Sequence, residues 1–182
     1  MSESDAPSTR CGFAALVGAP NAGKSTLVNA LVGAKVSIVS RKAQTTRAQV
    51  RGVMIEGLTQ IVLVDTPGIF APKRRLDRAM VASALSGAKD ADLNLLIVDA
   101  RKGADAEVSA LIQQLIQSPA PKWLVLNKVD VVARERLLAL AKELNEAQNF
   151  EETFMISAQK GDGLDRLRTR LAPAMPLSPW LY

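Results

Sequence analysis

The amino-acid sequence predicts an α/β fold with three layers (α/β/α), in which a six-stranded, mostly parallel sheet carries one antiparallel edge strand. Short apolar runs alternate along the chain with amphipathic stretches of helical length, a pattern typical of strand–helix–strand crossover units. Several of these runs are nearly continuous in Val, Leu and Ile, as expected for strands that are covered on both faces. Two neighbouring runs are separated only by Glu56 and Gly57, which predicts the antiparallel hairpin.

The expected elements follow in order from the apolar pattern. Strands are expected at residues 12–17, 48–55, 58–64, 93–98, 122–126 and 153–156. The helices between and after them are amphipathic, and they are expected at residues 24–33, 76–89, 105–117, 134–147 and 163–171. Residues 34–47 and 68–75 lack periodicity and are expected to be long loops, which in compact domains are usually functional.

Composition limits the chemistry that the chain can perform. The 182 residues suffice for one domain with a sizeable core. Histidine is absent and Cys11 is the single cysteine, which excludes an internal disulfide and a His/Cys zinc site. No apolar run approaches the roughly 20 residues that span a bilayer, so we expect a cytoplasmic protein. The net charge of +5 is compatible with a nucleic-acid or anionic-membrane partner and equally with a solvated surface.

The sequence divides into three expected parts. Residues 1–9 predict a short disordered tail, and residues 10–174 predict one domain. Residues 175–182 belong to the ending PAMPLSPWLY, and three prolines in so short a stretch cannot continue a helix. This last part is therefore expected to be a linker.

The stretch GAPNAGKS, residues 18–25, matches G-x-x-x-x-G-K-[ST] between an expected strand and an expected helix, and so predicts a P-loop NTPase fold. Its glycines permit a loop whose backbone N–H groups face an anion, and the helix N-terminus adds positive charge. Lys24 can reach the outer phosphates, and the Ser25 hydroxyl can ligate Mg²⁺. The alternative is a plain glycine-rich turn. The expected contacts with the nucleotide are Gly18, Ala19, Pro20, Asn21, Ala22, Gly23, Lys24, Ser25 and Thr26.

A second motif, DTPG at residues 65–68, follows the apolar run IVLV. A parallel strand would deliver Asp65 to the same edge of the sheet, where its carboxylate can hold Mg²⁺ through a water. The Gly68 N–H can meet a terminal phosphate. Taken alone, DTPG is also an ordinary turn. The contacts expected from this segment are Asp65, Thr66, Pro67, Gly68 and Ile69.

The motif NKVD, residues 127–130, distinguishes guanine from adenine. The Asp130 carboxylate can accept both the N1–H and the exocyclic amine of guanine, and the wrong base would leave a buried polar group unpaired. The Asn127 side chain can serve the O6/N7 edge of guanine or tie loops together, and the Lys128 stem can lie over the base. Small residues after the last strand would let a backbone N–H approach O6. The contacts expected here are Asn127, Lys128, Val129, Asp130, Ser157 and Ala158.

These motifs, in this order, resemble those of the TRAFAC GTPases over nearly the whole chain. The stretches VSIVSRKAQTTR (36–47), DTPGIFAPKRRLDRAM (65–80) and LLIVDARKG (95–103) narrow the resemblance to the Era-like GTPase family. The resemblance implies a GTP-hydrolysing switch in small ribosomal subunit assembly, with guanine nucleotide, small-subunit ribosomal RNA and a ribosome precursor as partners. It also implies that residues 175–182 lead toward an RNA-binding KH domain that is absent from this sequence. We expect a cytoplasmic monomer with peripheral association at the inner membrane.

The resemblance further implies a threonine that ligates Mg²⁺ in the GTP state. Thr45 and Thr46 are both available, and Thr46 is favoured because it precedes an arginine. The expected Mg²⁺ ligands are therefore Ser25, Thr46 and Asp65. The γ-phosphate of GTP would order residues 34–47 and 68–75, and its loss would release them.

Many GTPases place a glutamine directly after the DxxG motif to orient the attacking water, but Ile69 occupies this position. Catalysis is then expected to come from electrostatics elsewhere. The resemblance implies that Asn21 helps to bind K⁺ against the phosphates, so we expect slow, K⁺-stimulated hydrolysis; alternatively, Asn21 only rigidifies the loop. The expected catalytic residues are Asn21, Lys24, Thr46 and Gly68. The alternative function is a nucleotide-dependent RNA- or membrane-binding module with negligible turnover.

Overall fold

The computed structural model describes residues 8–33, 49–65 and 91–182. Within them the strands are β1 (Arg10–Gly18), β2 (Gln49–Glu56), β3 (Thr59–Asp65), β4 (Leu93–Asp99), β5 (Lys122–Asn127) and β6 (Glu152–Met155). The helices of the described part are α1 (Lys24–Val32), α3 (Ala106–Leu115), α4 (Arg134–Ala147), α5 (Leu164–Ala174) and the short 3-10 helix η2 (Val129–Val131). The helix expected at residues 76–89 and the loops expected at 34–47 and 68–75 lie outside the described residues.

The six strands form one sheet in the order β2-β3-β1-β4-β5-β6. β2 pairs antiparallel with β3, and every other neighbouring pair is parallel. The predicted mostly parallel sheet with one antiparallel edge strand is therefore confirmed. Because the parallel strands run the same way, the carboxyl ends of β1, β3, β4 and β5 meet at one edge of the sheet.

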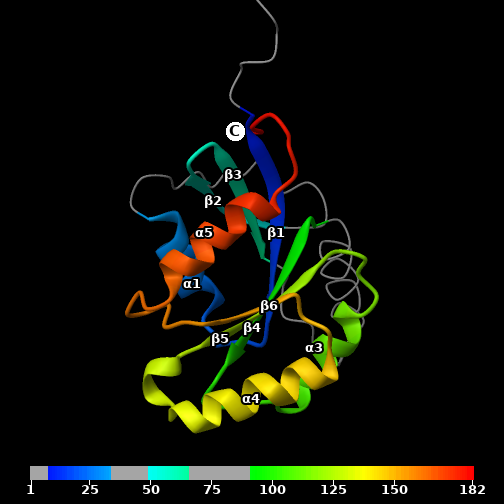
Figure 1. Cartoon of the computed structure of the whole chain (residues 1–182), viewed down its shortest axis with the longest axis vertical. Helices are drawn as coiled ribbons and strands as arrows, with labels where there is room; N and C mark the ends of the chain where they lie inside the picture. The colour runs from blue at the N-terminus through cyan, green and yellow to red at the C-terminus, as the bar shows by residue number, and fades with distance from the viewer. Residues whose placement is uncertain (1–7, 34–48, 66–90) are drawn as a thin grey trace, which may run out of the picture.

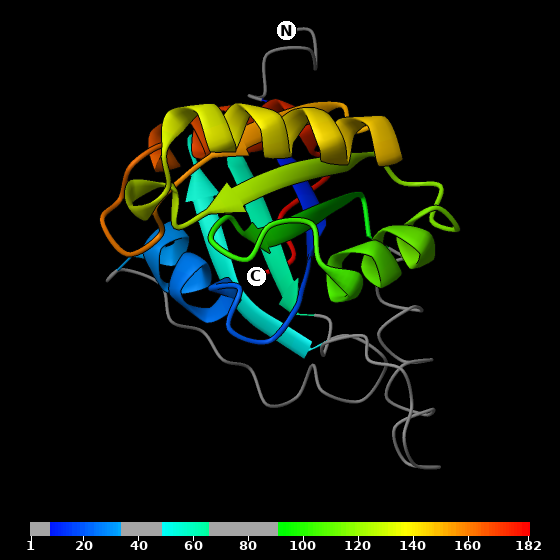
Figure 2. The ribbon, with the colours of Figure 1, turned by 90° about the horizontal axis from the view of Figure 1, so that it is seen from below.

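Helices cover both faces of the sheet, so the predicted three layers are also confirmed (Figure 1). On one face α1 and α5 bury Leu27, Leu31, Leu167 and Leu171 against alternate residues of the strands. On the other face α3 and α4 bury their own leucines against the intervening strand residues. In the view of Figure 2 the strands pass between α1 on one side and α3 on the other. The strand side chains are thus buried on both faces, which explains their continuous apolar runs.

Element ends differ from the expected ones by a few residues. α3 begins one residue later than expected because the Asp105 carboxylate caps it, accepting a hydrogen bond from the Val108 N–H at 3.0 Å. α5 runs three residues beyond the expected end and contains Pro173 in its last turn. α4 has the expected bounds.

Residues 175–182 lie against the amino ends of β1 and β3, away from the edge where the parallel strands end. The buried Gln60 amide accepts hydrogen bonds from the Leu181 and Tyr182 N–H groups and donates one to the Tyr182 carbonyl oxygen. The Trp180 indole N–H donates to the Leu58 carbonyl oxygen at 3.0 Å. Among the helices of the described residues, none combines the length and the apolar character that crossing a membrane requires.

Candidate nucleotide-binding site

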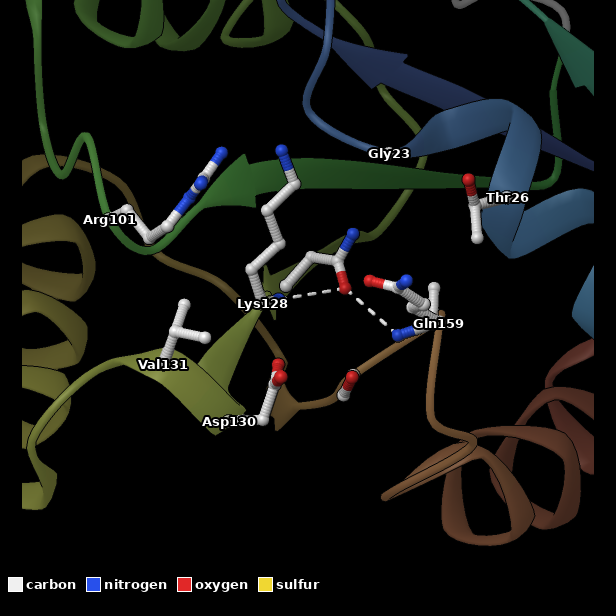
Figure 3. Close-up of a pocket in the computed structure, with 10 residues that line it drawn as sticks. Gly23, Thr26, Arg101, Lys128, Asp130, Val131 and Gln159 are labelled. Carbon is white, nitrogen blue, oxygen red and sulfur yellow. Dashed lines mark hydrogen bonds between the residues drawn. The ribbon is translucent and has the colours of Figure 1, made fainter.

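A pocket of about 570 Å³ opens at the edge where the parallel strands end (Figure 3). Its walls come from four places in the chain: the start of α1, the turn after β4, the segment after β5, and the turn after β6. The residues that line it are Gly23, Thr26, Arg101, Asn127, Lys128, Asp130, Val131, Ser157, Ala158 and Gln159. The structure therefore brings the NKVD and Ser-Ala motifs together with the end of GAPNAGKS.

The GAPNAGKS loop joins β1 to α1 as the sequence predicts. Gly18 ends β1, Lys24 begins α1, and Gly23 precedes the helix with φ of 102°. The N-cap residue of α1, Gly23, has no side chain that could cap the helix, and the first N–H groups of a helix can bind an anion. A Cβ atom on Gly23 would lie 2.2 Å from the Asn127 amide nitrogen, which leaves glycine as the residue that fits.

The buried Asn127 side chain ties the loops together, the second of the two roles expected for it. Its amide nitrogen donates to the Ala22 carbonyl oxygen at 2.9 Å. Its amide oxygen accepts from the Lys128 N–H at 2.8 Å and from the Ala158 N–H at 3.0 Å (Figure 3). These three partners are all backbone groups, so Asn127 fixes residues 127–130, the expected base-binding segment, against residues 18–25, the expected phosphate loop.

The Asp130 carboxylate borders the pocket with its side chain 15% exposed. Partial burial raises the pKa of Asp130, but the Ser157 hydroxyl, a backbone N–H and the Lys160 ammonium outweigh this and hold that pKa below its ordinary value. Lys160 Nζ lies 3.5 Å from Asp130 Oδ2. An ionised carboxylate at this position can accept two hydrogen bonds side by side, as the Watson–Crick edge of guanine requires.

Lys128 contacts the phosphate loop through its ammonium group. Lys128 Nζ donates to the Asn21 carbonyl oxygen at 2.7 Å and to Asp99 Oδ2 at 2.9 Å. Lys128 also lines the pocket. Asp99 is buried and also accepts three hydrogen bonds from the main chain and guanidinium of Arg101.

Burial raises the pKa of the Asp99 carboxyl, but the hydrogen bonds from Arg101 and Lys128 outweigh this and lower that pKa to about 2. A carboxyl with a lowered pKa in the folded state stabilises the fold above about pH 4, and this stabilisation is lost as the pH falls toward 2. We therefore expect the difference in unfolding free energy between the wild type and Asp99→Asn to narrow by about 2 kcal/mol from pH 6 to pH 2. Urea denaturation at several pH values measures this difference, and a constant difference would contradict the assignment.

Part of the expected site lies outside the described residues, namely Thr45, Thr46, Thr66, Pro67, Gly68 and Ile69. Asp65 ends β3 and is in register with Leu16 of β1, so its backbone reaches the expected edge of the sheet. Ser25 and Thr26 lie in the first turn of α1. No group of three or more His, Cys, Asp and Glu residues that could hold a metal by itself occurs in the described part of the chain.

Sequence reasoning missed Asp99, Arg101, Val131, Gln159 and Lys160 as residues of this site. A usable signal existed for Asp99, because it ends the apolar run LNLLIV as Asp65 ends IVLV. The same edge-of-sheet argument that selected Asp65 applies to Asp99. The other four are single loop residues that follow a strand or a motif. The alternation of polar and apolar residues does not distinguish such positions from ordinary loop residues.

The comparisons with known proteins agree with this geometry. The model of a family described as 50S ribosome-binding GTPase matches residues 13–128. The chain is 63% identical over 182 residues to GTPase Era of Afipia carboxidovorans, and this alignment covers 100% of this chain and 59% of that relative. It is 59% identical over 180 residues to GTPase Era of Brucella suis, with 99% of this chain and 58% of that relative covered. The chain thus spans less than two thirds of the length of these relatives.

Solved structures show the same similarity. The crystal structure of Era in complex with MgGDPNP and nucleotides 1506–1542 of 16S ribosomal RNA matches with a TM-score of 0.81 and 38% identity, covering 96% of this chain and 60% of that chain. An Aquifex aeolicus Era variant bound to GDP.AlF4⁻ matches with a TM-score of 0.80 and 38% identity, again covering 96% of this chain and 60% of that chain. The resemblance to the Era-like GTPases that the sequence motifs indicated is confirmed.

Proposed function

Since this chain belongs to the 50S ribosome-binding GTPase family, we propose that it binds guanine nucleotide in the pocket of Figure 3 and hydrolyses GTP to GDP and phosphate as a molecular switch. One observation carries the proposal: the Asp130 carboxylate borders a pocket whose opposite wall is the start of the phosphate-loop helix. A guanine base held at Asp130 would direct its phosphates toward that helix.

The residues around the pocket fit a Mg²⁺-nucleotide. Mg²⁺ would neutralise charge on the phosphates and hold them in position. The backbone N–H groups at the start of α1 and the Lys24 side chain would bind the phosphates. Ser25 and Asp65, with Thr46 from outside the described residues, would ligate the metal. Gly68 would bind the terminal phosphate. Thr66, Pro67 and Ile69, the other contacts expected from this segment, would lie beside it.

The base-binding residues would act together. Asp130 would accept from the two donors of guanine, while the turn after β6, which the Ala158 N–H ties to Asn127, would lie beside O6. Adenine presents no donor at the ring nitrogen that meets Asp130, so binding it would leave the carboxylate unpaired. Val129 and Ser157 would support this arrangement: the Val129 N–H donates to the Ile156 carbonyl oxygen, and the Ser157 hydroxyl bonds Asp130.

Stimulation by K⁺ belongs to this proposal as well. Asn21 lies in the phosphate loop, is exposed and adopts φ of 66°. We expect hydrolysis to be several-fold faster in KCl than in NaCl and the difference to disappear in Asn21→Gly. Glycine accepts positive φ without strain, so this variant removes the amide side chain and keeps the loop conformation. Equal wild-type rates in both salts would contradict a role for K⁺.

The wider role is proposed from the relatives. One similar structure is that of Era with MgGDPNP and a segment of 16S ribosomal RNA. We propose that this chain serves small-subunit assembly as a cytoplasmic monomer that associates peripherally with the inner membrane. Residues 10–174 would form the GTPase domain, with residues 1–9 as a tail and residues 175–182 leading onward to an RNA-binding domain.

Measuring phosphate release from GTP tests the enzymatic part of the proposal. We expect Mg²⁺-dependent release above the buffer background in the wild type and background release in Lys24→Ala. The second candidate, a nucleotide-dependent binding module with negligible turnover, predicts tight GDP and GTP binding with release at background in both proteins. Failure to bind guanine nucleotide would contradict both candidates.

A further inference from the structure

We propose that Asp99 is a positioning residue that couples the base-binding segment to the phosphate loop through Lys128. This inference rests on the proposed function, because it concerns the same pocket. It adds a residue that lies in none of the four motifs predicted from the sequence. The observation behind it is a chain of contacts from the Asp99 carboxylate through the Lys128 ammonium to the Asn21 carbonyl oxygen.

The sheet places Asp99 between the two segments. Asp99 is the last residue of β4 and is in register with Asn127, the last residue of β5. On its other side β4 pairs with β1, which leads into the phosphate loop. The Asp99 side chain is only 5% exposed, whereas that of Lys128 is 28% exposed. The buried Asp99 carboxylate therefore holds the more exposed Lys128 ammonium in place.

The backbone conformation shows why these loops need an anchor. Asn21 and Lys128 are the two non-glycine residues with positive φ in the described parts of the chain, at 66° and 64°. A left-handed conformation is unfavourable for a residue with a side chain. The Lys128 ammonium joins these two positions directly, because it donates a hydrogen bond to the Asn21 carbonyl oxygen. The Asp99 carboxylate fixes the ammonium at the point where it does so.

Charge strengthens this coupling. The Asp99 carboxylate lies between two cations: Arg101 Nη2 at 3.1 Å and Lys128 Nζ at 2.9 Å, both to Oδ2. Figure 3 shows the Arg101 and Lys128 side chains extending next to each other in nearly the same direction. An uncharged amide at position 99 would leave two cations facing each other without their shared anion. Lys128 is then expected to leave the Asn21 carbonyl oxygen, and the two loops lose their connection.

A double-mutant cycle on GDP affinity tests the proposal. The dissociation constant of a fluorescent GDP is measured for the wild type, Asp99→Asn, Lys128→Met and the double variant, with the fold of each checked by circular dichroism. We expect Asp99→Asn to weaken GDP binding by about tenfold, in keeping with the loss of a buried charged partner. In the Lys128→Met background the same substitution is expected to have no further effect, because the residue through which it acts is gone.

A control removes the charge of an aspartate that also pairs with an arginine, but on the surface and away from the pocket. Asp165 pairs with Arg168 at 3.4 Å on the surface of α5, and its side chain is fully exposed. Asp165→Asn is expected to leave GDP affinity unchanged. If Asp99→Asn does not fold, Asp99→Glu replaces it in the cycle; this variant keeps the charge, displaces the carboxylate by one methylene, and is expected to show a smaller loss that again vanishes in Lys128→Met.

Two results would overturn the inference while leaving the proposed function intact. The first is a folded Asp99→Asn protein whose GDP affinity lies within twofold of the wild type. The second is an equal loss on substituting Asp99 in the presence and in the absence of the Lys128 ammonium, which would mean that Asp99 acts by another route. A wild-type protein that does not bind GDP would instead contradict the proposed function itself.

Discussion

Substitution of Asp130 by Asn is expected to transfer the base preference from guanine to xanthine. The carboxylate that would accept two guanine donors becomes an amide that presents one acceptor and one donor, and xanthine offers the matching carbonyl oxygen in place of the exocyclic amine. Because a mismatched polar group in this pocket is left unpaired, we expect GDP affinity to fall by roughly 100-fold or more. Titration with GDP and with xanthosine diphosphate measures the loss of affinity for the first and the gain for the second.

The structure indicates that this substitution leaves the pocket intact. Ser157 can still bond the amide at position 130, and the Lys160 contact is largely exposed, so its loss has a small effect. Asp165→Asn serves as the control of equal charge change, with no shift in base preference expected. An Asp130→Asn protein that still prefers GDP, or that gains nothing toward xanthosine diphosphate, would show that another group reads the base.

Replacing Gly23 by Ala is the second change with a large expected effect. A Cβ atom there would lie 2.2 Å from the Asn127 amide nitrogen, and the residue has φ of 102°, which a side chain disfavours. The Asn127 amide would have to move away from the Ala22 carbonyl oxygen, breaking the link between the base-binding segment and the phosphate loop. We expect guanine nucleotide affinity to fall by roughly 100-fold or more, since both halves of the pocket are displaced.

Gly57→Ala separates this effect from backbone strain. Gly57 also has positive φ, 59°, but nothing lies within 4 Å of the position that its Cβ would occupy. This substitution in the β2–β3 turn is expected to lower the unfolding free energy by about 1–2 kcal/mol and to leave nucleotide affinity unchanged. Similar losses of affinity in Gly23→Ala and Gly57→Ala would show that strain, and not the collision with Asn127, is responsible.

The order of the helices and strands along the chain, and the direction of the strands, could be predicted because the local pattern of apolar residues indicates them. The run LNLLIV of β4 is apolar on both faces, so it predicts a central parallel strand. Leu137, Leu140 and Leu144 repeat at helical spacing, and α4 has the expected bounds. The end of α5 could not be predicted from spacing, because the helix continues past Leu171 to bring Met175 into the core.

The parts of the site that one continuous motif forms could be predicted from the sequence. The contacts between segments that are distant in the sequence could not. GAPNAGKS specifies its own turn, and its positive φ at Gly23 follows from the sequence. The contact between Asp99 and Lys128 joins residues 29 positions apart, and it exists only because β4 and β5 pair in one register. That register depends on the packing of the whole sheet, which the pattern of a single segment does not contain.

Displacement of a fluorescent GDP by unlabelled nucleotides tests the central claim most directly, which is that Asp130 selects guanine while the loop before α1 holds the phosphates. The account predicts that GDP and GTP displace the probe at concentrations at least about 100-fold lower than ADP and ATP. It also predicts that GMP, which lacks the outer phosphates, competes poorly. Displacement by ATP at the same concentration as GTP would contradict the account.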